Sequence, residues 1–138
     1  MLPADESTPI FASMITGIGF DLVTIERFGR FLSRHGERGT ARLFTAAEME
    51  YCRAQANPLP SYAARFAAKE AFYKALGTGV GSAGGWKDVE VVRLASGRPL
   101  LMLHGRAAAL AHETQVRTIH LSLSHTAQTA GAFVVLEA

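Results

Sequence analysis

One segment of the chain, residues 62–76, has the composition of a long and largely buried α-helix. It is rich in alanine, also contains phenylalanine, lysine and glutamate, and has neither glycine nor proline. A proline-containing turn at residues 57–60 precedes it, and Ser61 can cap its first turn. Gly77 follows directly and is the residue type that most often ends a helix. The rest of the fold must therefore pack around this helix.

The segments around this helix predict an α+β fold in which a mostly antiparallel sheet packs with the long central helix. Apolar runs separated by turn residues predict strands at residues 15–23, 89–94, 100–104, 120–124 and 130–136. Further helices are expected after Thr24, from a capping box at residues 45–48, and over residues 105–113. The first strand is a nearly continuous apolar run, so we expect it to be buried, with glycines where its backbone closely approaches another element.

Length and composition exclude several classes of protein. The 138 residues fit one domain, which we expect at residues 14–138, with residues 1–13 as an N-terminal extension that shows no periodicity. No apolar run reaches the roughly 18–20 residues that a membrane helix needs, and the first fourteen residues lack the pattern of a secretory signal. The single cysteine, Cys52, cannot form an internal disulfide, which indicates the reducing cytoplasm.

The distribution of charge is more informative than its sum. A net charge of +2 is too small to favour a nucleic-acid partner, but five arginines and one acidic residue lie between Arg27 and Arg42. Arg27, Arg30 and Arg34 fall on one face of the expected helix, away from its apolar residues. Such a surface suits an acidic partner or a phosphate-bearing ligand. A solvated helix face explains the same charges equally well.

Two carboxylates occur in apolar settings. Asp21 lies in the apolar first strand, where a lone carboxylate costs several kcal/mol unless it is paired or bound to a cation. Glu70 shares a helix face with Phe66. Such a pair is a natural site for Mg²⁺, which takes one or two carboxylates plus phosphate oxygens and waters. Lys74 would face the same pocket as a phosphate-binding cation, and His125 could add another. A plain surface ion pair between Glu70 and Lys74 is the competing interpretation.

Four motifs resemble the acyl-carrier-protein synthase family of 4′-phosphopantetheinyl transferases. GIGFDLV at residues 17–23 resembles its opening GIGxDIV, and RFAAKEAFYKALGTG at residues 65–79 resembles its central RFAAKEAFxKALGTG. WKDVEV at residues 86–91 with GRP at 97–99, and SLSHT at residues 122–126, are similar to its later strands and turn. The motifs occur in the family's order and spacing over residues 14–137. The chain is thus identified as a member with the family's fold.

The resemblance implies an enzyme that transfers 4′-phosphopantetheine from coenzyme A to a serine of apo acyl carrier protein, releasing adenosine 3′,5′-bisphosphate. Asp21 and Glu70 match the family's magnesium ligands, with Glu70 as the candidate general base. Lys74 matches a lysine that faces the phosphates. The resemblance also implies a coenzyme A site that includes Arg65, Gly77, His125 and Thr126, and it places Arg27, Arg30 and Arg34 against the carrier protein. It further implies a homotrimer with active sites between subunits.

Two other functions compete with this interpretation. A module that only binds coenzyme A or a carrier protein would not need Asp21, Glu70 and Lys74 together. A metal-dependent hydrolase of nucleotide pyrophosphates would not need a basic helix. One departure from the family concerns residues 54–60, which lack a lysine or arginine that many relatives place before the central helix. The sequence also does not distinguish a fatty-acid carrier protein from a polyketide one.

Overall fold

The computed structural model describes residues 13–138, so the expected extension at residues 1–13 lies outside it except for Ser13. The elements follow one another as β1 (Ile15–Thr24), α1 (Ile25–Leu43), α2 (Ala46–Arg53), α3 (Pro58–Leu76), the 3-10 turn η2 (Trp86–Asp88), β2 (Val89–Arg93), β3 (Pro99–Leu103), α4 (Gly105–Glu113), β4 (Thr118–His125) and β5 (Thr129–Glu137). The α+β prediction is confirmed. None of the helices within residues 13–138 could cross a bilayer.

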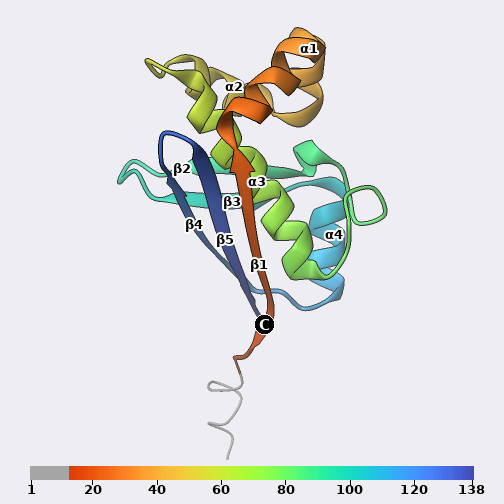
Figure 1. Cartoon of the computed structure of the whole chain (residues 1–138). Coiled ribbons are helices and arrows are strands. Elements are labelled where there is room, and N and C mark those ends of the chain that lie inside the picture. Colours follow the sequence, from red (N-terminus) through yellow and green to blue (C-terminus); the bar gives the residue numbers. More distant parts are fainter. Residues whose placement is uncertain (1–12) are drawn as a thin grey trace, which may run out of the picture.

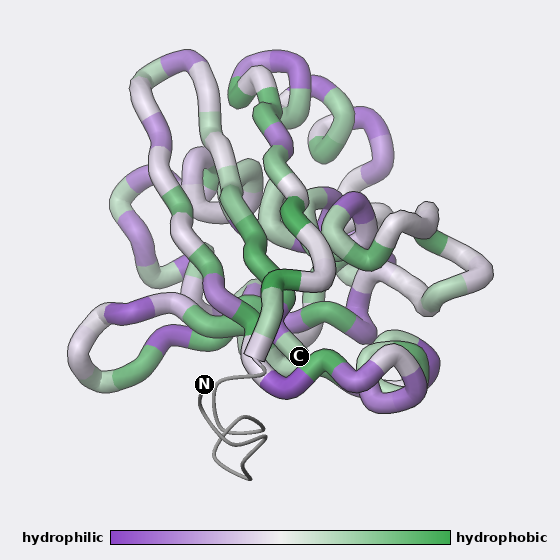
Figure 2. The backbone as a smooth tube through the Cα atoms, turned by 90° about the horizontal axis from the view of Figure 1, so that it is seen from below, coloured by the Kyte–Doolittle hydropathy of each residue, from purple (hydrophilic) through white to green (hydrophobic). Residues whose placement is uncertain are grey.

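Two antiparallel sheets surround the central helix α3 (Figure 1). The larger one has the strand order β1-β5-β4, and β2 and β3 form a separate hairpin. Hydrophobic stretches run along the strands of the larger sheet (Figure 2). One face of this sheet meets α3, where Ala132 and Val134 of β5 join Ala67, Ala71 and other small side chains in the main core. Helices α1 and α2 lie together at one end of α3 (Figure 1).

The long helix begins earlier than the sequence indicates. It starts at Pro58, and the Asn57 side chain accepts a hydrogen bond from the Leu59 amide at 3.3 Å, so Ser61 lies inside the helix and does not cap it. Proline is tolerated here because the first amides of a helix have no partner within it. The predicted end is confirmed, since Gly77 adopts a left-handed conformation with φ +80°.

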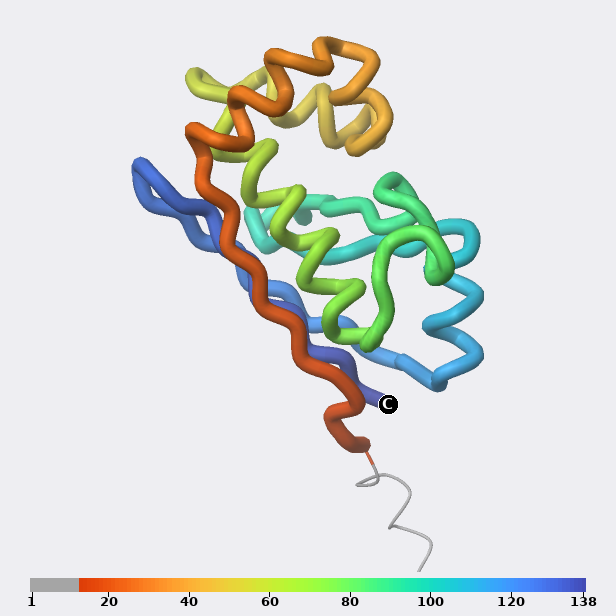
Figure 3. The backbone as a smooth tube through the Cα atoms, turned by 45° about the vertical axis from the view of Figure 1, so that its right-hand side comes forward, coloured from red at the N-terminus to blue at the C-terminus, as the bar shows by residue number. Residues whose placement is uncertain are grey.

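Strand β1 runs alongside α3 (Figure 3), and the two backbones approach each other closely at Gly17 and Gly19. A Cβ at Gly17 or Gly19 would overlap the carbonyl oxygen of Ala75 or Ala71. The prediction that this strand is buried is wrong for its other face, where Ile18 is 57% and Leu22 61% exposed. The reason is that α3 covers only one face of the sheet within the described chain, so the opposite face of β1 and of its neighbour β5 is open.

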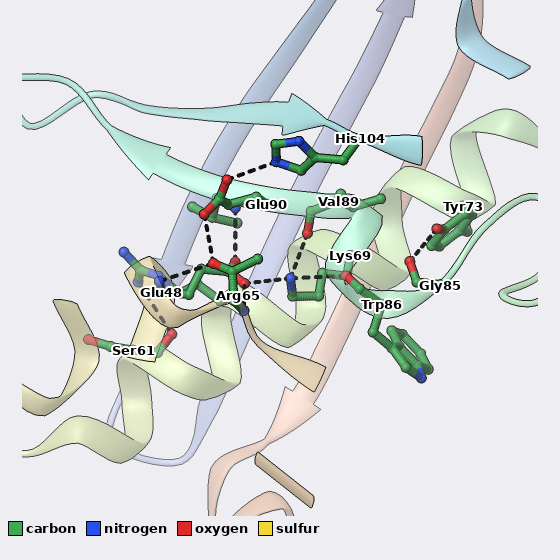
Figure 4. Close-up of polar contacts among 12 residues, drawn as sticks. Glu48, Ser61, Arg65, Lys69, Tyr73, Gly85, Trp86, Val89, Glu90 and His104 are labelled. Carbon is green, nitrogen blue, oxygen red and sulfur yellow. Dashed lines mark hydrogen bonds and ion pairs between the residues drawn. The ribbon is translucent and has the colours of Figure 1, made fainter. Parts of the chain in front are cut away.

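A buried ion pair and the hydrogen bonds around it join α3 to α2, η2 and β2 (Figure 4). Lys69 is fully buried, and its Nζ donates to Glu48 Oε1 at 2.7 Å and to the carbonyl oxygens of Trp86 and Val89 at 3.1 and 2.5 Å. Glu48 also completes the capping box at the start of α2 and accepts the Val91 amide at 2.9 Å. Burial lowers the pKa of Lys69, and the Glu48 carboxylate opposes that change.

Replacing Gly19 by alanine should strongly destabilise the fold. The added methyl group would meet backbone and not a flexible side chain, so β1 must move away from α3, at a cost of about 3 kcal/mol or more in unfolding free energy. Urea unfolding at fixed protein concentration measures this loss of unfolding free energy. The matched control is Gly79→Ala, because a Cβ at Gly79 would have no atom within 4 Å. The unfolding free energy of this variant should stay within about 0.5 kcal/mol of that of the parent. Equal stability of both variants would contradict the close contact.

Lys69→Met should lower the free energy of unfolding by about 3–5 kcal/mol, because it leaves the buried Glu48 carboxylate without its cation. The double variant Lys69→Met/Glu48→Gln should lose clearly less than the two single losses combined, since the pair acts as a unit. Lys87→Met, at an exposed position in η2, is the control and should change stability by less than about 0.5 kcal/mol. Additive losses would show that the pair is not coupled.

Candidate active site

A groove of about 430 Å³ lies where β1, α1 and α3 meet. Charged side chains from all three elements reach it. Its lining combines these with apolar residues from the same elements: Asp21, Leu22, Val23, Thr24, Arg27, Phe28, Phe31, Phe66, Glu70 and Lys74. The structure therefore brings together four of the residues singled out from the sequence, namely Asp21, Arg27, Glu70 and Lys74.

An ion pair between Asp21 and Lys74 connects β1 to α3 inside this groove. Lys74 Nζ lies 2.7 Å from Asp21 Oδ1 and 3.1 Å from the carbonyl oxygen of Phe20. The Asp21 side chain is only 14% exposed, so the sequence-based requirement that it be paired is met. The hydrogen bond to Asp21 raises the pKa of the Lys74 ammonium. Lys74 thus pairs across two elements and not with Glu70, which argues against a simple ion pair within the helix.

Glu70 is half-buried one turn before Lys74 on the same helix face. Burial raises the pKa of its carboxyl group, and the nearby Asp21 carboxylate raises it further, against the opposing charge of Lys74. Two carboxylates that repel each other in a half-buried groove form a site in which a cation is stabilised. Residues 13–138 contain no cluster of three or more potential metal ligands. Asp21 and Glu70 nevertheless fit Mg²⁺, because that ion needs only one or two protein carboxylates when phosphates and waters supply the rest.

The three arginines of α1 have different surroundings. Arg27 lines the groove with Glu70. Arg30 and Arg34 line a second, larger groove of about 820 Å³ between α1 and the start of α3. Arg30 is also paired with Glu26 at 2.9 Å in an exposed position. All three arginines are exposed on α1, but they border two different grooves.

His125 and Thr126 lie at the end of β4, away from the carboxylates. They line a hollow of about 250 Å³ on the open face of the large sheet, together with Phe20 and Leu22. Leu22 borders both the hollow and the groove, whereas Asp21, Glu70 and Lys74 line the groove alone and His125 and Thr126 the hollow alone. A single chain therefore does not bring His125 and Thr126 together with Glu70.

Arg65 and Gly77 also lie outside the groove. Arg65 is 2% exposed, its guanidinium lies 4.1 Å from the centre of the Tyr51 ring, and it donates to the Ser61 carbonyl oxygen at 3.4 Å (Figure 4). Its Nε has no hydrogen-bond partner within the described chain. Gly77 is exposed and ends α3. The structure thus places Arg65 in the packing between α2 and α3.

Sequence reasoning missed the aromatic wall of the groove. The Phe28 ring stacks on Phe66 at 4.9 Å and on Phe31 at 6.1 Å between ring centroids. The spacing of these residues in the sequence could have indicated the wall. Phe66 precedes Glu70 by one helical turn and Phe31 follows Arg27 by one turn, so each ring lies on the same helix face as a charged residue of the groove.

Known proteins resemble this chain over most of its length. The profile of the 4′-phosphopantetheinyl transferase superfamily matches residues 17–132. The holo-(acyl-carrier-protein) synthase of Koribacter versatilis is 47% identical over 124 residues, which cover 90% of this chain and 99% of that relative. The crystal structure of the Neisseria meningitidis synthase has a TM-score of 0.85 at 34% identity and covers 91% of this chain and 100% of its own.

A similar structure with a bound ligand is also known. The Bacillus anthracis synthase, solved in complex with CoA (3′,5′-ADP), has a TM-score of 0.74 at 34% identity, covering 91% of this chain and 98% of its own. The match spans most of each chain, and the matched region contains the groove and its carboxylates. This chain belongs to the 4′-phosphopantetheinyl transferase superfamily and, within it, to the holo-(acyl-carrier-protein) synthase family.

Proposed function

We propose that this protein transfers the 4′-phosphopantetheine group of coenzyme A to a serine of apo acyl carrier protein, for fatty acid or polyketide biosynthesis. The observation that carries the proposal is the groove in which Asp21, Glu70 and Lys74 converge from two elements. Family membership supports the same reaction. The reaction joins the serine oxygen to the β-phosphorus of coenzyme A and breaks the bond from that phosphorus to adenosine 3′,5′-bisphosphate.

Asp21 and Glu70 are the residues that would hold Mg²⁺, because both are carboxylates facing one groove and Glu70 has no hydrogen-bond partner within the described chain. When bound, the ion neutralises charge on the pyrophosphate of coenzyme A. The dependence on Mg²⁺ is part of the proposal and rests on this donor set.

Lys74 and Glu70 would carry the remaining chemistry. The Lys74 ammonium is 53% exposed at the edge of the groove, so its Nζ can contact phosphate oxygens and offset charge on the leaving bisphosphate. Glu70 Oε atoms can accept the serine proton as the general base. Phosphoryl transfer needs mainly positioning and electrostatic stabilisation, which this set of residues provides.

The carrier protein would dock beside the groove, on α1. Arg27 borders the groove itself, and Arg30 and Arg34 continue the positive surface along the helix. Acidic carrier proteins would be steered by these exposed charges, with an effect that falls with ionic strength. Because Glu26 already neutralises Arg30, we expect Arg27 and Arg34 to contribute more. A cytoplasmic location fits both substrates and the free, buried Cys52.

A homotrimer would complete the site. The open face of the large sheet exposes Ile18, Phe20, Leu22 and Phe133, which are 57%, 51%, 61% and 41% exposed. A contiguous apolar surface of this kind usually marks an interface. His125 borders the same face, so a second copy seated there could present its groove to this His125 and Thr126. The shared coenzyme A site expected from the resemblance follows from that arrangement.

Asp21→Asn and Glu70→Gln should each reduce transfer by at least about a hundredfold, because each removes a carboxylate from the reacting centre. The test incubates the protein with coenzyme A, Mg²⁺ and apo acyl carrier protein and weighs the carrier product by mass spectrometry. Circular dichroism checks the fold, and Glu113→Gln on α4 is the exposed control. Near-normal turnover in either variant would remove that residue from the site. Absence of product with the parent protein would refute the function.

Phe20→Asp should convert the trimer to monomers and abolish most of the activity. Its ring packs edge-on against Phe133 at 5.9 Å in the open sheet face, and a carboxylate there cannot be buried against a second copy. Sedimentation velocity measures the assembly. Met102→Asp places the same charge at a residue that is 46% exposed on the β2–β3 hairpin, and it should leave the assembly intact. A monomeric parent protein with full activity would contradict the shared site.

A further inference from the structure

Trp86 lies behind the groove, at the start of η2. Its indole packs on the Phe66 ring, with centroids 5.0 Å apart and planes tilted by 34°. Phe66 in turn stacks on Phe28 at 4.9 Å and 29°. Phe28 and Phe66 line the groove with Glu70, whereas Trp86 is outside its lining. Trp86 therefore supports the aromatic wall of the groove from its far side.

The backbone around Trp86 is fixed to α3 at two points (Figure 4). Lys69 Nζ donates to the Trp86 carbonyl oxygen at 3.1 Å, and the Tyr73 hydroxyl donates to the Gly85 carbonyl oxygen at 2.6 Å. The Gly85 amide is bound in turn by Asp88 Oδ2 at 3.1 Å. Because Lys69 is fully buried and held by its ion pair with Glu48, a shift of this turn would break its hydrogen bond to a side chain that cannot follow it.

Two neighbouring faces of α3 are thereby connected. Phe66, Glu70 and Lys74 follow one another at intervals of one turn and face the groove. Lys69 and Tyr73, also one turn apart, face η2. Trp86 contacts both faces. Its carbonyl oxygen accepts a hydrogen bond from Lys69, and its ring packs on Phe66, which faces the groove.

We propose that Trp86 is a positioning residue for the transfer reaction. Its indole holds the Phe66 ring, and with it the apolar wall one turn from Glu70, in a single orientation. A smaller side chain would leave a void behind Phe66 and allow that ring other rotamers. Displacement of a groove wall by about 1 Å can lower turnover by about a hundredfold. This inference rests on the proposed function and adds a residue that touches neither substrate.

Steady-state kinetics at saturating coenzyme A and apo acyl carrier protein test the role. Trp86→Leu should lower kcat about tenfold or more, and Trp86→Phe, which keeps a ring against Phe66, should stay within about threefold of the parent. Val91→Ala is the matched control, because Val91 is buried in the core on β2 and is not part of the wall. It should lower the Tm and leave the kcat of the folded protein near that of the parent. Equal kcat in the parent and Trp86→Leu, or equal losses in Trp86→Leu and Val91→Ala, would overturn the proposal.

A double-mutant cycle shows whether Trp86 acts through Phe66. In a Phe66→Leu background, Trp86→Leu should change kcat by less than about twofold. Independent, multiplying effects would overturn the proposed route. If the wild-type protein gives no holo product, the proposed function itself fails. If it does give product and Trp86→Leu is fully active, only the positioning role fails.

A measurement with Trp86 in place covers the case in which Trp86→Leu does not fold. Trp86 is the only tryptophan of the chain, so its fluorescence reports on this contact alone. Phe66→Leu should shift the emission to longer wavelength because water gains access to the indole. Phe133→Leu, on the open sheet face, should leave it unchanged. An unchanged emission in Phe66→Leu would overturn the contact and the proposal with it.

Discussion

The close contact between β1 and α3 is the constraint on which the site depends. Gly17 and Gly19 have no side chains, so the strand lies directly on the backbone of the helix. This proximity places Asp21 of β1 2.7 Å from Lys74 of α3 and within reach of the Glu70 charge. A bulkier residue at either glycine would separate the two elements and, with them, the carboxylates. The glycines of the opening motif are therefore as necessary to the chemistry as the charged residues themselves.

Lys69 and Glu70 are consecutive residues of α3, but their charged groups lie in different environments. A helix turns by about 100° per residue, so Lys69 and Glu70 face different surroundings. Lys69 is fully buried and its three donors are all satisfied, by Glu48 and two carbonyl oxygens. Its desolvation is offset by that complete set of partners. Glu70 is half-buried beside another carboxylate, which raises its pKa and favours a bound cation. Lys69 therefore holds the surrounding elements together, whereas Glu70 faces the groove and is available for chemistry.

The residues expected to bind coenzyme A are divided between two depressions of the surface. Asp21, Glu70 and Lys74 share the groove, whereas His125 and Thr126 border the hollow on the open sheet face. Within one chain these two sets of residues line separate depressions that share only Leu22. The proposed trimer resolves this division, since the exposed apolar face that would bind a second copy also carries the hollow.

The sequence by itself determined the order and type of the elements, the capping box at Thr45, the helix end at Gly77 and, through its motifs, the family. These features depend on local spacing and backbone preference, which a short stretch of chain carries within itself. Only the tertiary structure decided which surfaces are covered. Arg65 and Glu70 belong to one motif, yet Arg65 is packed on Tyr51 and Glu70 faces the groove. Likewise, the apolar β1 residue Ile18 is exposed, because burial depends on which elements become neighbours in space and not on the residues next to it in the chain.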